Sequence, residues 1–441
     1  MKFEVIPLPY LNNTEHLLRA LSKHQHLIAF ESGSSSHPNG TWSIVSAKPI
    51  KTIVQAAPIK ELTPQINQLK AEADAIMTKT ANAPLDFPFA GGVLGVLPYD
   101  AGSLQFTPTK TSGHPAFAGI YTWALLFNHY NKNLNLVTWN HPDSLSKDEI
   151  CSLVFDLESN NKTSISKSAY APAVFKPLWS TGDYGKAFDA TKDYIKSGDV
   201  YQINLTQRFD LNERRSPIES YLYLKDISVS PYLCYAHIKE DLVLASASPE
   251  MFLEVNQCSV TTKPIKGTRP VSNNEKENLS AIHELTNSPK DRAENIMIVD
   301  LLRNDLSITC EKVQVNKLCE VESFELVHHL VSTIQATKKN NITSFDVFAN
   351  AFPGGSITGA PKKRAMEIID ELEGSYRSYY CGSAFAWSHD DQLRSNILIR
   401  SFVFEGSKVT CWGGGGIVDD SEKRSEYEES LNKVSRLMSS I

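Results

Sequence analysis

The sequence predicts an α+β protein, because strand patterns and long helical patterns both occur along it. Residues 201–209 alternate between apolar and polar side chains except at Gln207, which is typical of a strand with one buried face. The apolar runs 119–127 and 134–139 have the length of strands. Residues 288–305 and about 421–438 carry apolar side chains at helical spacing. Strands and helices should therefore share the core.

The composition is that of a globular protein without a nucleic-acid or membrane partner. The chain has 441 residues with 41% hydrophobic residues, enough for one large domain or two. Its net charge of −6 offers no basic field for nucleic acid or anionic lipid. Its start lacks a signal-peptide pattern, and no apolar run approaches about 18 residues. We therefore expect a cytoplasmic protein whose seven scattered cysteines are free thiols.

A polar stretch divides the chain into two regions. Residues 160–173 are rich in Ser, Lys and Asn and have no apolar periodicity, which indicates a connector. The prediction is an N-terminal region 1–158, a connector 159–174 and a C-terminal region 175–441. Nearly all candidate chemistry lies in the C-terminal region.

The first candidate positions lie on the alternating strand. Its polar face carries Gln202 and Asn204. Such a face is as often solvated as it is turned into a binding site, and the strand alone does not decide between the two.

An acid and a lysine follow at the ends of two further strands. The strand 242–248 stops at Pro249-Glu250, and the strand 259–262 leads into a segment in which Pro264 and Gly267 bracket Lys266. This bracketing predicts a turn that fixes the lysine. A lone acid or lysine in such a place is usually solvated, but rigid scaffolds also hold reactive groups there.

Two helices each present a pair of acids on one face. Ser288 is the expected N-cap of the first, with Asp291 and Glu294 three residues apart, and the second carries Glu426 and Glu429 at the same spacing. Acidic pairs are commonly solvated. If these two converge, their oxygen atoms suit Mg²⁺. The sequence has no Cys/His cluster for zinc.

Anion-binding features appear late in the chain. The apolar run 397–404 predicts a strand, and Arg400 lies inside it. A guanidinium there must find a partner, either a protein acid or a ligand carboxylate. The four glycines 413–416 let backbone amides approach a ligand, although such a run can also be a simple bend. The turn 353–362 opens a helix and favours anions, but it lacks the spacing of a nucleotide-binding P-loop.

The order and wording of these segments resemble the chorismate-utilising enzymes. The motifs are GDVYQINLTQRF, SASPEMF, DRAENIMIVDLLRND, FPGGSITGAPK, GGGGIVDDS and EYEESLNK, and they cover most of the region from about residue 183 to the end. The N-terminal region is compatible with that of the anthranilate and aminodeoxychorismate synthase large subunits. The resemblance implies large antiparallel β-sheets packed with helices around a central active-site cleft.

Within this family, the segment holding Lys266 resembles the aminodeoxychorismate synthase branch, whereas the anthranilate synthase counterpart usually has alanine there. Isochorismate and salicylate synthases carry a lysine in place of Gln202 to activate water. The resemblance therefore implies amination of chorismate at carbon 4. Glu250 corresponds to the general acid for the departing hydroxyl, and Lys266 to a covalent nucleophile at carbon 2. Such a nucleophile must be a neutral amine, which requires desolvation or a nearby positive charge.

The resemblance also implies a metal site and a set of substrate contacts. Glu294 and Glu429 correspond to the main Mg²⁺ ligands, and Asp291 and Glu426 to further, water-mediated contributors. Arg400 and the Gly416 amide correspond to the clamp on the ring carboxylate. The other expected substrate-binding residues are Gly415, Ser356, His329, Tyr380, Gln202 and Thr268.

The resemblance implies partners as well. The sequence contains no cysteine in a glutaminase-type nucleophile setting, so ammonia is expected from a separate glutaminase subunit. The segment containing Glu31 and Ser32 resembles the tryptophan pocket of anthranilate synthases, although it can also be a structural strand and turn. Two alternatives remain open: an anthranilate synthase large subunit, and a non-catalytic chorismate-binding subunit.

Overall fold

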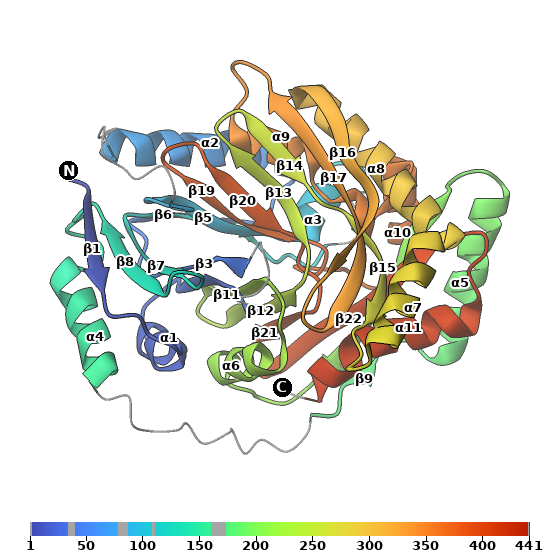
Figure 1. Cartoon of the computed structure of the whole chain (residues 1–441), viewed down its shortest axis with the longest axis horizontal. Helices are drawn as coiled ribbons and strands as arrows, with labels where there is room; N and C mark the ends of the chain where they lie inside the picture. The colour runs from blue at the N-terminus through green and yellow to red at the C-terminus, as the bar shows by residue number, and fades with distance from the viewer. Residues whose placement is uncertain (1, 34–39, 78–86, 108–110, 160–172, 440) are drawn as a thin grey trace.

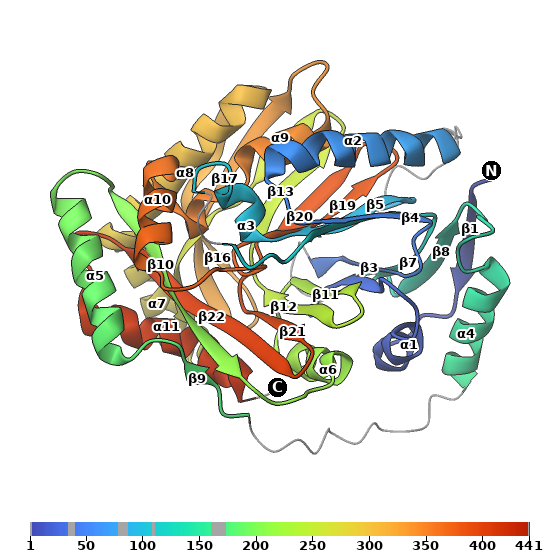
Figure 2. The same cartoon turned by 180° about the vertical axis from the view of Figure 1, so that it is seen from behind.

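Two large antiparallel β-sheets form the centre of the molecule, and helices surround them (Figures 1 and 2). The computed structural model describes residues 2–33, 40–77, 87–107, 111–159, 173–439 and 441. Among these residues, twelve strands form the first sheet and ten the second. Side chains from both sheets share one hydrophobic core. The predicted α+β class is therefore confirmed.

Both sheets combine strands from the two ends of the chain. In spatial order, the first sheet consists of β1 (Glu4–Leu8), β8 (Asn133–Thr138), β7 (Trp123–Asn128), β3 (Trp42–Ser46), β2 (Ile28–Glu31), β11 (Tyr232–Lys239), β12 (Leu242–Ser248), β21 (Ser401–Glu405), β22 (Lys408–Ile417), β10 (Gln202–Leu211) and β18 (Gly359–Ala360), with β9 (Lys176–Pro177) beside β10. The second consists of β15 (Ile265–Pro270), β17 (Val327–Lys338), β14 (Ser259–Thr262), β13 (Met251–Asn256), β20 (Leu393–Asn396), β19 (Ser383–Ser388), β5 (Gly92–Leu97), β6 (Ala116–Tyr121) and β4 (Lys51–Gln55), with β16 (Cys310–Ser323) beside β17.

Helices cover the outer faces and the ends of the sheets. In Figure 1, α2 and α9 lie beside the second sheet, α1, α4 and α6 lie along the first, and α5, α7, α8, α10 and α11 gather at the end where β15 and β22 meet. The helices are α1 (Glu15–Leu21), α2 (Ile59–Ile76), α3 (Tyr99–Ser103), α4 (Lys147–Ser159), α5 (Thr181–Lys196), α6 (Pro217–Ile227), α7 (Glu275–Asn287), α8 (Pro289–Thr309), α9 (Ser344–Ala351), α10 (Lys362–Leu372) and α11 (Lys423–Met438), with a 3-10 turn η2 at Gly355–Ile357.

The regions predicted on either side of the connector share both sheets. β2 pairs with β11, and β5 pairs with β19, so strands from 1–158 and from 175–441 are hydrogen-bonded together. Most of the predicted connector, 160–172, lies outside the described residues. No helix in the described ranges is long and apolar enough to cross a membrane.

Two of the places where the chain passes between the two sheets are neighbours. The chain leaves β12 of the first sheet and enters β13 of the second at Pro249–Glu250, and it returns from β20 to β21 through residues 397–400. Backbone hydrogen bonds join the two crossovers, from Ile397 N to Glu250 O at 3.1 Å and from Ala247 N to Arg400 O at 3.0 Å. Polar side chains at the crossovers therefore lie between the sheets.

Candidate active site

Ser356 joins the buried acid to the lysine. Its hydroxyl donates to Glu250 Oε1 at 2.9 Å, while its backbone oxygen lies 3.5 Å from Lys266 Nζ. Ser356 belongs to η2, Glu250 to the first crossover and Lys266 to β15. Three segments that are distant in sequence therefore bring a carboxyl group, a hydroxyl group and an amine to one place.

The Lys266 segment differs from the predicted turn. Lys266 lies within β15, opposite Leu330 of β17, and the register shifts between Lys266 and Thr268. Gly267 adopts a φ of 76° at this bulge, and a Cβ atom there would lie 2.7 Å from Leu285. Proline and glycine suggested a turn because the partner strand β17 comes about sixty residues later and could not be foreseen locally.

Glu250 is buried, and its environment favours the protonated form of the carboxyl group. The side chain is 7% exposed, and burial raises the pKa of Glu250 above its usual range, although Lys266, Ser356, Lys433 and Arg400 act in the opposite direction. A carboxyl group whose pKa is raised in this way is a better proton donor than an exposed glutamate.

Arg400 lies at a bend instead of inside a strand. β21 begins only at Ser401, and Arg400 has a φ of 54°, so the prediction that it continues the apolar strand is wrong. Burial lowers the pKa of Arg400, and Glu250 is the acid that partly offsets this effect. A half-buried guanidinium that interacts with this acid at the crossover suits an incoming carboxylate.

The glycine run is part of a strand and not a bend. β22 continues through residues 413–416 to Ile417 and pairs with β10. A Cβ atom at Gly416 would lie 2.5 Å from Gln202 Nε2. Gln202 is fully buried, and neither atom of its amide has a hydrogen-bond partner in the described part of the chain. The polar face of β10 is therefore buried, against the expected half-buried strand, and Gln202 retains its capacity to bind a ligand.

The acid pairs lie close to lysines. Two of these acids approach Gly415 closely. A Cβ atom at this position would lie 3.3 Å from Glu426 Oε2 and 3.6 Å from Glu429 Oε1. Lys290 Nζ lies 3.5 Å from Glu426 Oε1, and Lys433 Nζ lies 2.7 Å from Glu429 Oε1. Burial alone would raise the pKa of Glu429, but Lys433 lowers it below its usual range.

The acids of helix α8, Asp291 and Glu294, belong to the same group of charged side chains. Burial raises the pKa of Glu294, and Glu426 acts in the same direction. Asp291 Oδ2 lies 3.4 Å from Arg269 Nη2. In the described residues, no three acidic, histidine or cysteine side chains form a ready-made metal cluster. Lys433 Nζ shares the space over Gly415 with the two carboxylates, at 3.5 Å from the position of a Cβ atom there. The donors are carboxylate oxygens, which are the ligands that a hard cation such as Mg²⁺ prefers.

Three further predicted positions have protein partners. Thr268 is exposed, and its hydroxyl lies 2.8 Å from Nδ1 of the buried His329 on the neighbouring strand. Tyr380 is buried and stacks on Trp412 with ring centroids 6.0 Å apart. Burial raises the pKa of Tyr380 well above its usual range. His329 and Tyr380 are therefore fixed by packing.

Glu31 lies in a separate polar cluster at the end of β2. Its carboxylate accepts hydrogen bonds from Thr14 Oγ1 at 2.6 Å, Lys225 Nζ at 2.6 Å and Tyr221 OH at 2.8 Å. Burial would raise the pKa of Glu31, but these partners outweigh it and lower the pKa. The backbone amide of neighbouring Ser32 donates to Ser43 Oγ at 3.1 Å. These contacts give Glu31 a structural role in holding β2, α1 and α6 together. Tryptophan binding stays a prediction.

Replacing Lys225 with methionine should lower the free energy of unfolding by about 3 kcal/mol at neutral pH, because it leaves Glu31 buried as an unpaired charge. The native pKa of Glu31 lies below its unfolded value, so this pair stabilises the fold above the unfolded pKa and is lost as pH falls through the folded pKa. The deficit of the variant should therefore shrink on acidification. Urea unfolding at several pH values measures it, and Lys51→Met, which breaks the exposed pair with Glu72, should cost below about 1 kcal/mol.

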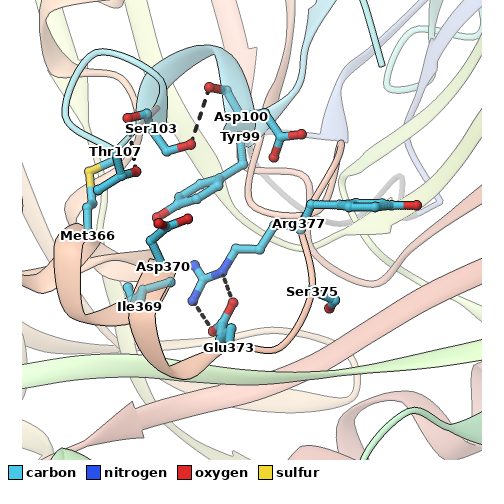
Figure 3. A pocket seen from close by; sticks show the side chains of 11 residues that line it. Tyr99, Asp100, Ser103, Thr107, Met366, Ile369, Asp370, Glu373, Ser375 and Arg377 are labelled. Atoms are coloured by element: carbon cyan, nitrogen blue, oxygen red, sulfur yellow. Dashed lines mark hydrogen bonds and ion pairs between the residues drawn. The ribbon is translucent and has the colours of Figure 1, made fainter. Parts of the chain in front are cut away.

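Two cavities formed by described residues outside this cluster do not suit a dianionic organic substrate. Figure 3 shows a cavity of about 20 Å³ lined by Tyr99, Arg377 and Glu373 among others, which has room for about one water molecule. A hollow of about 470 Å³ beside β13 and β14 is lined by Glu254, Asn256, Gln257, Ser259 and Thr261, and offers no cation. The Glu250 region therefore remains the candidate site.

Sequence reasoning missed the lysines around the acids. Lys290 directly precedes Asp291, and Lys433 follows Glu429 by four residues. The spacing of Lys433 is a recognisable helical pair. The contact of Lys290 with Glu426 joins α8 to α11 and has no local signal.

The fold and this site define a family. The model of the chorismate binding enzymes matches residues 26–439. The chain belongs to this family.

The chain is similar over nearly its whole length to named relatives. It is 35% identical to aminodeoxychorismate synthase component 1 of Klebsiella aerogenes, over 98% of each chain. It is 34% identical to aminodeoxychorismate synthase component 1 of Escherichia coli K12, over 98% of this chain and 95% of that one. The crystal structure of anthranilate synthase component I from Streptococcus pneumoniae TIGR4 superposes with a TM-score of 0.75 at 27% identity, covering 91% of this chain and 93% of that one.

Proposed function

We propose that this protein is the chorismate-aminating component of an aminodeoxychorismate synthase, converting chorismate and ammonia to 4-amino-4-deoxychorismate and water. The observation that carries the proposal is the placement of Lys266 beside Ser356, which also holds the buried acid Glu250. The relatives from Klebsiella aerogenes and Escherichia coli carry this name.

The residues divide the chemistry between them. The neutral amine of Lys266 attacks carbon 2 of chorismate, both double bonds of the ring diene shift by one position, and the hydroxyl at carbon 4 leaves as water with the proton of Glu250. Ammonia then adds at carbon 4, and Lys266 leaves as the double bonds shift back. Arg400 and the amide of Gly416 hold the ring carboxylate, and the free amide of Gln202 is available beside them.

Three carboxylates lie near Lys266. Glu250, Glu294 and Glu429 each interact electrostatically with Lys266. Bound Mg²⁺ supplies positive charge that offsets these acids and binds a substrate carboxylate. Glu294 and Glu429, with Asp291 and Glu426, are the residues that would hold it.

Glu429→Ala should weaken Mg²⁺ binding by about 10- to 100-fold, because one carboxylate ligand is lost. Calorimetric titration of the protein with Mg²⁺ measures this directly. Glu428→Ala is the matched control, since Glu428 is the adjacent and equally exposed acid on α11 and pairs with Arg424. Equal affinity of the two variants would exclude Glu429 as a ligand.

The product test separates the candidate functions. The purified chain is incubated with chorismate, Mg²⁺ and an ammonium salt, and the products are separated by chromatography with mass detection. Aminodeoxychorismate supports the proposal, and anthranilate would instead identify an anthranilate synthase component. Tight chorismate binding without turnover would indicate a non-catalytic subunit. Addition of a glutaminase subunit and glutamine in place of ammonium tests the proposed ammonia source, and a tryptophan titration tests the cluster around Glu31.

A further inference from the structure

The residues around Glu250 are themselves held by a buried arginine that lies outside the site. Arg377 is 2% exposed and follows α10 in the segment leading to β19. Its guanidinium lies over the ring of Tyr99 at 4.7 Å (Figure 3). None of the site residues described above is in its immediate sequence neighbourhood except Tyr380.

Arg377 binds Glu373 through two hydrogen bonds. Nε donates to Glu373 Oε2 at 2.8 Å, and Nη2 donates to Oε1 at 2.6 Å. Glu373 Oε1 also accepts from the backbone amide and the hydroxyl of Thr206, both at 2.9 Å. The pair therefore connects the end of α10 to β10, the strand that carries Gln202.

The remaining guanidinium donors reach two backbone carbonyls. Nη1 donates to Ile357 O at 2.8 Å, and Nη2 donates to Asn204 O at 2.5 Å. Ile357 directly follows Ser356, whose hydroxyl and carbonyl contact Glu250 and Lys266. A single planar group thus ties the η2 turn to β10 at the point where Ser356 contacts both reactive groups.

The geometry points to Arg377 as a positioning residue that holds Ser356 against Glu250 and Lys266 through the carbonyl of Ile357, with Glu373 orienting its guanidinium. This inference rests on the proposed function for its kinetic consequence, although the contacts themselves do not depend on it. Small displacements of a group in an active site can lower rates strongly while leaving ground-state binding nearly unchanged.

Arg377→Lys is the informative variant, because it keeps the positive charge beside Glu373. A lysine ammonium lacks the planar fork and should not hold Glu373, Ile357 O and Asn204 O together. Arg208→Lys is the matched control. Arg208 is also buried, pairs with Asp210 at 2.8 Å and lies over Tyr376 at 4.9 Å, but it belongs to the far half of β10.

Three measurements are expected to change in Arg377→Lys and not in Arg208→Lys. The kcat for chorismate should fall by about 10- to 100-fold with KM within about twofold. The alkaline limb of the kcat profile should move to higher pH, as in Ser356→Ala, because Glu250 loses a donor to its ionised form while Lys266, Arg400 and Lys433 still face it. Hydrogen exchange should accelerate in the peptide 352–361.

The outcomes separate positioning from simple destabilisation. The inference is overturned if Arg377→Lys matches Arg208→Lys in all three measurements. It is equally overturned if exchange rises throughout the protein while the alkaline limb stays in place. If the unmutated protein fails to convert chorismate, the proposed function fails, and exchange in 352–361 still decides whether Arg377 holds the turn.

Discussion

Replacing Lys266 with alanine is expected to lower kcat for aminodeoxychorismate formation by about 10³-fold or more, equivalent to about 4 kcal/mol of barrier. The lysine supplies the nucleophile in the proposed route, and no other amine in the described chain is bonded to the Ser356 carbonyl. Initial rates with saturating chorismate and ammonium measure the loss. Lys263→Ala, three residues earlier in the same segment, should retain activity.

The covalent step can be observed directly in the unmutated protein. In the absence of ammonia, acid quenching after mixing with chorismate and Mg²⁺ should yield a species heavier by chorismate minus one water. Peptide mapping should place the added mass on Lys266. A Lys266→Ala enzyme with the parent kcat would refute the covalent route, and a large loss of kcat without any adduct would assign Lys266 to electrostatic or proton-transfer work.

Local sequence patterns predicted the bounds of strands and helices better than they predicted which faces of these elements are buried. The strands 242–248 and 259–262 are found with the expected bounds, and the helix expected to run to about residue 438 ends there. These patterns depend on neighbouring residues. The alternation of β10, by contrast, left open whether its polar face is solvated. Gln202 and Thr206 are buried, and Thr206 donates to Glu373 at the end of α10.

The site residues came from recognising family motifs, and their arrangement came from the fold. Glu250 and Arg400 lie near each other because two of the crossovers between the sheets, β12 to β13 and β20 to β21, are neighbours, which no local pattern indicates. The strand assignment of Arg400 failed for the same reason, since an apolar run does not reveal where the chain changes sheets. Arg377 was missed because an arginine between polar and aromatic residues has no periodicity that would predict burial.

Glu250→Gln is expected to lower kcat by about 10²- to 10⁴-fold, the usual contribution of a positioned general acid. Glutamine has nearly the same shape, and its carbonyl oxygen can still accept from Ser356, so the fold should be preserved. Comparison of kcat with a thermal unfolding curve separates lost chemistry from lost structure. A variant with the parent kcat would remove Glu250 from the reaction.

The pH dependence follows from the protonation of this acid. Glu250 donates a proton only in its neutral form, so kcat should be high below its pKa and fall as pH rises through it. Because burial raises the pKa of Glu250, this alkaline limb should lie above the range of an exposed glutamate. The rates are compared at a fixed concentration of free ammonia, because ammonium titrates as well.

Two variants move this limb in ways that identify its origin. Ser356→Ala removes the hydroxyl that donates to the Glu250 carboxylate. This donor favours the ionised form, so its loss should raise the pKa further and shift the limb to higher pH. In Glu250→Gln the limb should disappear, because the residual reaction no longer depends on this proton. A limb that stays at the parent pH in both variants would belong to another group, and Glu250 would then not be the acid that sets the rate.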